Sequence, residues 1–324
     1  MADEEGNLKF VVAGVGGAGC NSINRLAKSG FKGAKLVAFN TDKKQLDIIP
    51  DDVHKVLLGE GVTQGLGAGG DPQIGLKSAL ATRGEISRHV KDADLVFILA
   101  GMGGGTGTGA SPIIAQMARE AGALVLGFVY FPFKMEKSRV RCGQKGISKL
   151  TDECDSLVVI ENDRLTKWAE NVPIEQAFAM ADDVAAKAVL GISRTILEPS
   201  VLNIDFADLK AITADKGLSM ISYGESSGPM KVHDIPNAVL DHPLLGVDYS
   251  KATGALVHFT GGPDLRLSDA TFAGENIMSK LPENVNVSWG ARMDDSYEKR
   301  LEAFVIFTGI PSPLLLDPDA FPKD

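Results

Sequence analysis

The 324-residue sequence has few of the residues that mark several specialised protein classes. It has 3 cysteines, none of them in a CxxC pair, and 5 histidines without metal-ligand spacing, so neither a disulfide framework nor a metal centre is expected. The net charge of −9 and the absence of a Lys/Arg run argue against nucleic acid as a partner. The N-terminus is acidic, unlike a signal peptide, and the most apolar stretch, Ala123–Phe131, is far shorter than the roughly 20 residues that cross a bilayer. We therefore expect a cytoplasmic protein that does not insert directly into a membrane.

Glycine, in contrast, is abundant. The chain has 36 glycines, where average usage would give roughly 23. Many of them fall into three clusters, Gly14–Gly19, Gly59–Gly70 and Gly101–Gly109. They show no every-third period, which excludes collagen, and the hydrophobic content of 44% excludes a disordered chain. The clusters therefore mark local turns in a globular protein of one or two domains.

The first half of the chain alternates short apolar runs with amphipathic helical patterns. The runs are nearly continuous, which is typical of parallel strands covered on both faces. Helices are expected at Cys20–Ser29 and at Ser111–Ala121, the latter opened by Ser111 as cap and Pro112 as first helical residue. The alternation predicts a doubly wound α/β domain over residues 1–172. Its strands are expected at Leu8–Ala13, Lys35–Phe39, Val53–Leu58, Leu95–Ala100, Ala123–Tyr130 and Ser156–Ile160.

A long helix and a second domain follow. Apolar residues at helical spacing predict a central helix from Pro173 to Leu197, on the order of 36 Å long at about 1.5 Å per residue. It lies within a connecting segment, residues 173–204, which precedes a smaller α+β domain over 205–311 and a short tail over 312–324. A polar loop is expected at Gly224–Gly228. The helices of the second domain are expected at Phe206–Ala214 and Ser268–Ser279, and its strands at Gly254–Thr260, Val285–Ala291 and Glu302–Thr308.

The first glycine cluster follows the first expected strand and opens a helix. Residues Gly14–Gly19 match G-x-G-x-x-G, whose glycines let backbone N–H groups approach a pyrophosphate at a helix N-terminus. Asp42 follows the second strand at about the distance expected of a ribose-binding acid. Taken alone, this pattern indicates a dinucleotide site and an NAD(P)-dependent oxidoreductase. The structural alternative is a tight turn that packs a helix on a sheet.

The other two clusters favour a different nucleotide. GMGGGTGTG at 101–109 follows the fourth strand and adds a second ring of backbone donors with two hydroxyl groups, which a dinucleotide enzyme does not need. GLGAGGD at 65–71 supplies a third loop that could close over a terminal phosphate. G-x-x-x-x-G-K-[ST] is absent, so the site is not an ordinary P-loop. Three loops of this kind suit a multiply charged phosphate chain.

Several motifs occur in one order along about residues 8–310. They are AGVGGAGCN, FNTD, GLGAGGDP, GGGTGTG, PFKME, ENDRL and NIDFADLK. GGGTGTG is the signature loop of the tubulin superfamily, the whole order resembles the FtsZ family, and ALVHFTGGPDLRL is more similar to its archaeal members. The resemblance implies a Rossmann-like GTPase domain joined by the central helix to a smaller α+β domain. It also implies GTP or GDP as the nucleotide, Mg²⁺ held mainly by the phosphates, and a role in cell division.

The resemblance implies roles for individual residues as well. Glu136 and Arg139 are similar to the pair near the ribose and phosphates, with Arg141 as the alternative to Arg139. Phe178 would stack on guanine, unless it packs in the core. Asp183 would accept from two adjacent guanine donors, of which adenine offers only one, unless it lies on a solvated helix face. The expected nucleotide site comprises Gly16, Gly17, Ala18, Gly19, Cys20, Asn21, Asp42, Ala68, Gly69, Gly70, Gly103, Gly104, Gly105, Thr106, Gly107, Thr108, Glu136, Arg139, Phe178, Asp182 and Asp183.

Asn203, Asp205 and Asp208 form a second candidate constellation, for catalysis. Paired acids can orient and polarise the water that hydrolyses a γ-phosphate. Alternatively, Asp205 caps a helix beginning at Phe206, with Asp208 in its first turn. By helix rise these residues follow the central helix on the order of 30 Å beyond the base contacts. We therefore expect them to act on the nucleotide of the next subunit, in a heterologous contact that propagates into a filament.

The main expected partner is another copy of the chain, in a head-to-tail polymer at the division site. Leu314–Leu316 and Phe321 give the tail a small apolar face, which motivates the hypothesis that it docks a membrane-tethering adaptor. The oxidoreductase alternative leaves the second glycine cluster unexplained. A GTP-gated scaffold that does not hydrolyse GTP would have no need of Asn203, Asp205 and Asp208.

Overall fold

The computed structural model describes residues 8–214, 217–241 and 248–310. The chain divides into two compact units, Met1–Leu190 and Gly191–Asp324. The division falls inside helix α9 (Ile174–Leu197), which confirms the expected central helix. The tail hypothesis, with Leu314–Leu316 and Phe321, lies outside the described residues.

Six parallel strands form the sheet of the first unit, in the order β3-β2-β1-β4-β5-β6. Every residue of β1 and of β5 is buried, as the continuous apolar runs indicate for strands covered on both faces. All six strands expected in this part of the chain are present, with ends shifted by at most two residues. The strands are β1 Phe10–Val15, β2 Lys35–Asn40, β3 His54–Leu57, β4 Leu95–Gly101, β5 Leu124–Phe131 and β6 Ser156–Glu161.

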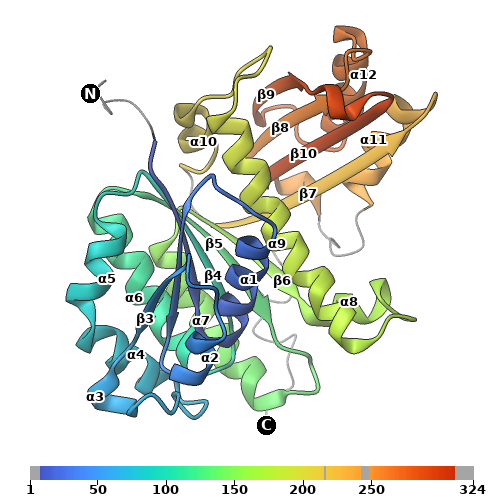
Figure 1. The fold of residues 1–324 in the computed structure, drawn as a ribbon. Coiled ribbons are helices and arrows are strands. Elements are labelled where there is room, and N and C mark those ends of the chain that lie inside the picture. The colour runs from blue at the N-terminus through green and yellow to red at the C-terminus, as the bar shows by residue number, and fades with distance from the viewer. Residues whose placement is uncertain (1–7, 215–216, 242–247, 311–324) are drawn as a thin grey trace, which may run out of the picture. The chain divides into compact units, whose positions relative to one another are not determined.

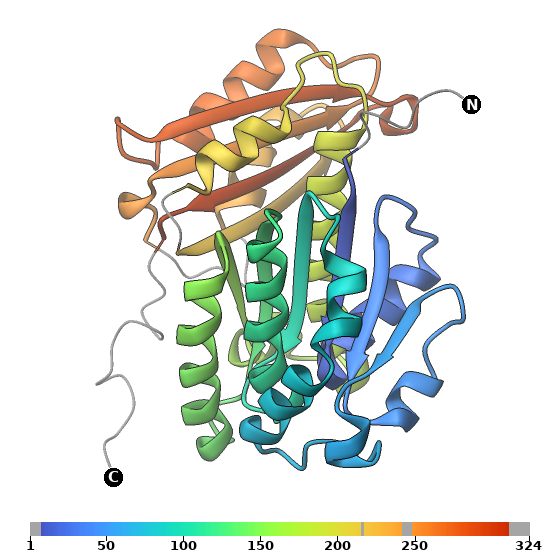
Figure 2. The same cartoon turned by 90° about the vertical axis from the view of Figure 1, so that its left-hand side faces the viewer.

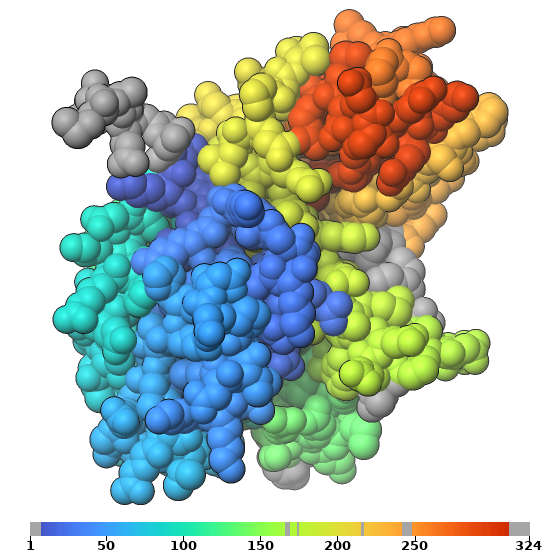
Figure 3. All heavy atoms as spheres, in the orientation of Figure 1, coloured from blue at the N-terminus to red at the C-terminus, as the bar shows by residue number. Residues whose placement is uncertain are grey.

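Helices cover both faces of this sheet. Helix α1 packs on β1, β2 and β4, whereas α6 and α7 pack on the opposite face, with α4 against α6 (Figures 1 and 2). Figure 3 shows, with all atoms, that the blue segments around α1, α2 and α3 cover one side of the unit. Besides α9, the helices of this part of the chain are α1 Gly16–Lys28, α2 Lys43–Asp47, α3 Glu60–Thr63, α4 Pro72–Ala81, α5 Arg83–Val90, α6 Thr106–Glu120, α7 Lys137–Glu153 and α8 Asn162–Trp168.

The expected start of α6 was wrong. The helix begins at Thr106, so Pro112 lies inside it and not at its first position. The hydroxyl of Ser111 does not cap the helix but donates to the carbonyl of Gly107 at 2.6 Å. Packing of α4 against α6 outweighs the low helix propensity of the Gly-Thr repeat. Helix α1 likewise begins earlier than expected, at Gly16.

The sheet of the second unit has the order β7-β10-β8-β9, with β10 antiparallel to β7 and β8, and β8 parallel to β9. Helices α11 and α12 contribute Ile235, Val239, Ala273 and Ile277 to its apolar core, which also contains Phe259 and Phe307. This arrangement confirms the expected smaller α+β domain. Its elements are α10 Phe206–Ile212, β7 Leu218–Ser227, α11 Lys231–Leu240, β8 Gly254–Gly261, α12 Leu267–Met278, β9 Asn286–Met293 and β10 Arg300–Thr308, with 3₁₀ turns at Tyr249–Lys251 and Asp295–Tyr297.

The polar loop expected at Gly224–Gly228 was wrong, because residues up to Ser227 belong to strand β7. Their partner is β10, where Ala303 pairs with Gly224 and Arg300 with Ser227. Arg300 also forms an ion pair with Glu225. A strand with so polar an end is stabilised by pairing with residues more than 70 positions away, which local composition does not reveal. Within the described ranges, no helix combines the length and apolar character needed to cross a membrane.

Candidate nucleotide site

The strand order of the first unit reverses between β1 and β4, and the glycine loops that follow these two strands lie at that point. In doubly wound sheets, ligands bind beyond the carboxyl ends of the strands at this switch point. A cavity of about 680 Å³ lies here, and all of its lining residues belong to the first unit. Its volume is within the usual range for small-molecule sites.

All three glycine loops reach this cavity. A Cβ atom on Gly105 would lie 2.7 Å from Cβ of Ala68 and 2.9 Å from the backbone N of Asp71, so the second and third loops meet only because this residue is glycine. Thr41 links the same loops: its hydroxyl lies 2.6 Å from that of Thr106, and its carbonyl accepts from the N–H of Gly67 at 3.0 Å. The convergence expected from the sequence is therefore present.

Two helices present their N-termini here, where backbone N–H groups lack partners within the helix. Helices α1 and α6 have no side-chain cap and no acidic residue in the first turn. Both features leave the positive end of the helix dipole for an anionic ligand. In the second loop, Thr108 accepts from the N–H of Gly103 at 2.9 Å and fixes the turn that leads into α6. This end of the cavity is suited to phosphates.

Helix α9 supplies an aromatic ring and a carboxylate on one face, because Phe178 and Asp182 are four residues apart. Phe178 is 41% exposed, so it is not a core residue, and its ring meets that of Phe133 edge-on at 6.0 Å. Asp182 accepts from the Ser22 hydroxyl at 3.0 Å, and this hydroxyl lies 2.8 Å from that of Tyr130. Burial raises the pKa of Asp182, opposed by the Ser22 hydrogen bond and by the charge of Arg25. Phe178 and Asp182 both line the cavity.

Asp183 does not line the cavity. Its side chain is 52% exposed and pairs with Arg25 at 3.2 Å. The neighbouring Asp182 is therefore the carboxylate that faces the ligand space. The signal that distinguishes the two residues was present in the sequence, since Asp182 and not Asp183 follows Phe178 by four residues.

Glu136 and Arg139 line the cavity, whereas Arg141 does not. The N–H of Phe133 donates to Glu136 at 3.2 Å, and the other oxygen of Glu136 pairs with Arg139. Asp42 also lines the cavity, but its carboxylate caps α2 by accepting from the N–H of Lys44 at 2.9 Å. Asp42 thus acts as a helix cap through one carboxylate oxygen, which explains an acid after the second strand without any contact to a ribose.

Some expected residues shape the loops without facing the cavity. Cys20 is fully buried, burial raises the pKa of its thiol to about 12, and its Sγ accepts from the side chain of Asn40 at 3.7 Å. The motifs FNTD and ENDRL contain two lining residues that sequence reasoning missed, Asn40 and Asn162. The expected residues that do not line the cavity are Gly16, Gly19, Cys20, Gly69, Gly103, Thr108 and Asp183. The lining residues not expected are Asn40, Gln45, Gly67, Gly101, Met102, Tyr130, Pro132, Asn162 and Ala181.

Asn203, Asp205 and Asp208 belong to the second unit, and none of them lines the cavity. Asp205 caps α10 by accepting from the N–H of Asp208 at 2.8 Å, and Asp208 accepts in return from the N–H of Asp205 at 3.0 Å. The capping role considered for these acids is therefore real. Capping engages one oxygen of each carboxylate, and the other oxygen of Asp208 accepts from the hydroxyl of Ser288 at 3.4 Å. Neither contact precludes a second role for these acids.

Comparisons with known proteins agree on one family. A model of the tubulin/FtsZ family GTPase domain matches residues 9–170, and a model of the FtsZ family C-terminal domain matches residues 217–311. Cell division protein FtsZ 2 of Methanocaldococcus jannaschii is 46% identical, over 100% of this chain and 86% of the relative. That of Haloferax volcanii is 45% identical, over 98% and 79%. An empty FtsZ dimer from M. jannaschii superposes with a TM-score of 0.87 at 38% identity, over 99% of this chain and 96% of that one.

Proposed function

The chain belongs to the tubulin/FtsZ family of GTPases, and from this membership and its cavity we propose that it hydrolyses GTP in a head-to-tail polymer of identical subunits. The observation that carries the proposal is the separation of two sets of residues. The nucleotide cavity is lined by the first unit alone, whereas the acids suited to activating water belong to the second. The first unit of each subunit thus holds a nucleotide, and the second unit carries a catalytic loop.

The three glycine loops account for the triphosphate. Backbone N–H groups at the starts of α1 and α6 bind the α- and β-phosphates, and the loop with Ala68 and Gly70 faces the γ-phosphate. Arg139, paired with Glu136 at the cavity wall, adds positive charge near the ribose and phosphates.

Guanine is selected at the other end of the cavity. Phe178 stacks on the base, and Asp182 accepts from N1–H and from the 2-amino group. Adenine has no donor at N1 and no amino group at C2, so the same carboxylate disfavours ATP.

The neighbouring subunit completes the site. Asp205 and Asp208 orient a water for attack on the γ-phosphorus, the bond to the β-phosphate oxygen breaks, and the proton of the water passes to phosphate or solvent. Exposed apolar side chains flank both sets of residues: Leu66 and Met135 next to cavity residues, and Val201 and Leu202 just before Asn203. Such side chains suit a contact between unlike surfaces, and this contact propagates as a filament.

The donor set also suits Mg²⁺ that arrives bound to the phosphates. Within the described part of the chain, no cluster of three or more His, Cys, Asp or Glu residues could hold a metal ion by itself. Mg²⁺ prefers oxygen ligands, which the phosphates would supply, and when bound it would offset their charge. We place the polymer at the mid-cell division site, with residues 312–324 as the segment that binds a membrane-tethering adaptor.

The test uses two variants with complementary defects. Asp208→Asn keeps a hydrogen-bonding side chain in the capping box but removes the charge, and we expect it to bind GTP without hydrolysing it. Gly105→Val puts a side chain where Ala68 and Asp71 leave no room, so it loses GTP binding while its catalytic loop stays intact. Each protein alone should release almost no phosphate, whereas a mixture should regain activity at mixed interfaces.

The control is each variant mixed with a buffer-matched inert protein at the same total concentration. No phosphate release above this control would reject the shared site. GTP binding by Asp208→Asn is checked separately with a fluorescent GTP analogue, so that loss of binding is not mistaken for loss of catalysis.

A further inference from the structure

The loop between α9 and α10 carries Asn203 and Asp205, with Asp208 following in the first turn of α10, and it lies on strands β8 and β9 of the same unit. Its backbone pairs with β9: the N–H of Leu202 donates to the carbonyl of Ala291 at 3.1 Å, and the N–H of Ala291 donates back to Leu202 at 3.1 Å. The loop also buries Ile204, between the exposed residues Asn203 and Asp205. It is therefore held as part of the sheet.

Gly290 allows this close approach. A Cβ atom at this position would lie 2.6 Å from the carbonyl oxygen of Leu202 and 2.9 Å from the side chain of Ile204. It would also lie 3.2 Å from the ring of His258, which faces Gly290 across the β8–β9 pair. The loop backbone, the glycine and the histidine ring thus form one packed layer.

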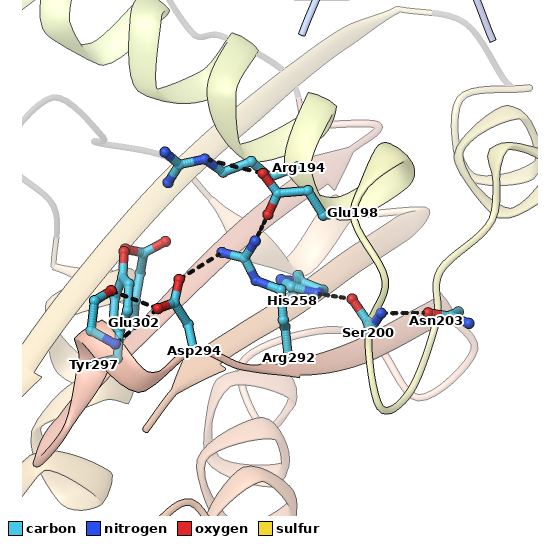
Figure 4. Close-up of polar contacts among 10 residues, drawn as sticks. Arg194, Glu198, Ser200, Asn203, His258, Arg292, Asp294, Tyr297 and Glu302 are labelled. Atoms are coloured by element: carbon cyan, nitrogen blue, oxygen red, sulfur yellow. Dashed lines mark hydrogen bonds and ion pairs between the residues drawn. The ribbon is translucent and has the colours of Figure 1, made fainter. Parts of the chain in front are cut away.

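His258 connects this layer to the loop. Its side chain is buried, with 3% of its surface exposed, and its Nε2 lies 3.3 Å from the hydroxyl of Ser200 (Figure 4). Burial lowers the pKa of His258 to about 4, so the ring is neutral near pH 7 and has one donor and one acceptor nitrogen. The N–H of Ser200 in turn donates to the side-chain oxygen of Asn203 at 2.8 Å. A short path of contacts therefore runs from the sheet core to Asn203.

A second contact fixes the start of the loop. Arg292 of β9 is largely buried and pairs with Glu198, the first residue after α9 (Figure 4). Arg194 lies 3.8 Å from the same carboxylate, and Asp294 lies 4.0 Å from the other side of the Arg292 guanidinium. Glu198 is thus held between two cations, and only one residue, Pro199, separates it from Ser200.

We infer that Ser200 and His258 are positioning residues for GTP hydrolysis, which hold the Asn203 amide and the loop behind it in the orientation that meets the neighbouring subunit's nucleotide. Neither residue lines the cavity, so neither touches GTP of its own subunit. The inference rests on the proposed function, because it assigns the loop's orientation a role in turnover. The hydroxyl of Ser200 is the group through which the sheet acts on the loop.

The test removes one hydroxyl at a time. Ser200→Ala keeps the backbone donor to Asn203 but loses the contact with His258, and we expect kcat to fall about threefold to tenfold. The KM for GTP should not change, because the cavity is unaltered. Ser200→Thr keeps a hydroxyl and should retain most of the activity. Ser279→Ala is the matched control: it removes a serine hydroxyl of the same unit, at the C-cap of α12, that donates to the carbonyl of Asn276 at 2.7 Å.

A double-mutant cycle with His258→Phe tests whether the two side chains act through each other. Phe keeps an aromatic ring in the buried site but has no nitrogen for Ser200. If they act as one unit, the double variant should lose no more kcat than the more impaired single variant. Unchanged kcat in folded Ser200→Ala, or a KM effect equal to the kcat effect, would overturn the inference.

The mixing experiment separates this inference from the proposed function. Ser200→Ala is placed in the Gly105→Val protein, which contributes only its loop, and is mixed with Asp208→Asn. Phosphate release threefold to tenfold below that of the parent mixture supports the inference, and equal release overturns it. If the parent mixture releases none, the shared site is rejected, and Ser200→Ala in the otherwise unaltered chain decides the positioning role.

Discussion

Replacing Asp182 by Asn should weaken GTP binding far more than replacing the adjacent Asp183. Asp182 lines the cavity beside Phe178, whereas Asp183 pairs with Arg25 at the surface. Asp182→Asn keeps the size of the side chain and its capacity to bond with Ser22. The two variants are chemically identical changes at neighbouring positions, so each is the control for the other.

The magnitude follows from the hydrogen bonds that guanine would make. A hydrogen bond to a charged group contributes about 1.5–3 kcal/mol, which corresponds to roughly a tenfold to 150-fold loss of affinity. Asn offers one acceptor and places an N–H₂ donor against the guanine amino group. Asp183→Asn loses only an exposed ion pair, worth about 0–1 kcal/mol, so its loss should be less than about fivefold.

The assay is an equilibrium titration with a fluorescent GTP analogue, followed by competition with GTP, ATP and xanthosine triphosphate. Xanthine has a carbonyl where guanine has the amino group, so Asp182→Asn should prefer it over guanine. A loss in Asp183→Asn equal to or greater than that in Asp182→Asn would refute this assignment of the base contact.

The pH dependence gives an independent check on the same carboxylate. Burial raises the pKa of Asp182, so this carboxylate takes up a proton at a higher pH than an ordinary aspartate, whose pKa is about 4. As the pH is lowered, GTP affinity should therefore begin to fall before the pH reaches the pKa of an ordinary aspartate. The stability of the empty protein responds in the opposite sense. A carboxyl group with a raised folded-state pKa favours folding as it is protonated, so this residue's contribution to stability increases as the pH falls through that pKa.

Two further predictions concern helix capping and thiol reactivity. Asp205→Asn keeps a cap on α10 and should change the free energy of unfolding by less than about 0.5 kcal/mol while it lowers kcat, whereas Asp205→Ala should cost about 1 kcal/mol as well. Chemical denaturation and phosphate release check the two quantities; equal kcat in Asp205→Asn and the parent would show that the acid is only a cap. Cys142, which is partly exposed, should be alkylated by iodoacetamide at pH 7.5 long before Cys20, whose buried thiol has a pKa of about 12. Peptide mass spectrometry follows both, and faster labelling of Cys20 would contradict the described packing.

Much of the fold could be predicted from local sequence because the first unit is built from local signals. Continuous apolar runs located its strands, and the stripe of α9 located the central helix. The wrong predictions are at places where contacts between residues far apart in the sequence determine where a helix or strand begins or ends. Strand β7 continues to Ser227 because β10 pairs with it, and α6 begins at Thr106 because α4 packs against it. Neither partner is visible in a window of ten residues.

In the candidate site, too, local sequence indicated some features, whereas others depend on contacts between distant residues. Glycine clusters and their strand context indicated the phosphate loops, but not which backbone atoms face the cavity and which only shape the turn, as at Gly103. The choice between Asp182 and Asp183 depended on helix phase, which the sequence contained. The contact between Ser200 and His258 joins residues 58 positions apart and carried no motif that could have revealed it.

The GTPase rate per subunit, measured across a range of protein concentrations, tests the shared active site most directly. Phosphate release and light scattering are recorded together with GTP, with GDP and ATP as controls. If the catalytic acids come from the next subunit, the rate per subunit should rise with concentration as scattering rises, and only with GTP. A rate per subunit that stays constant from the lowest concentration upwards would show a self-contained site and contradict the account.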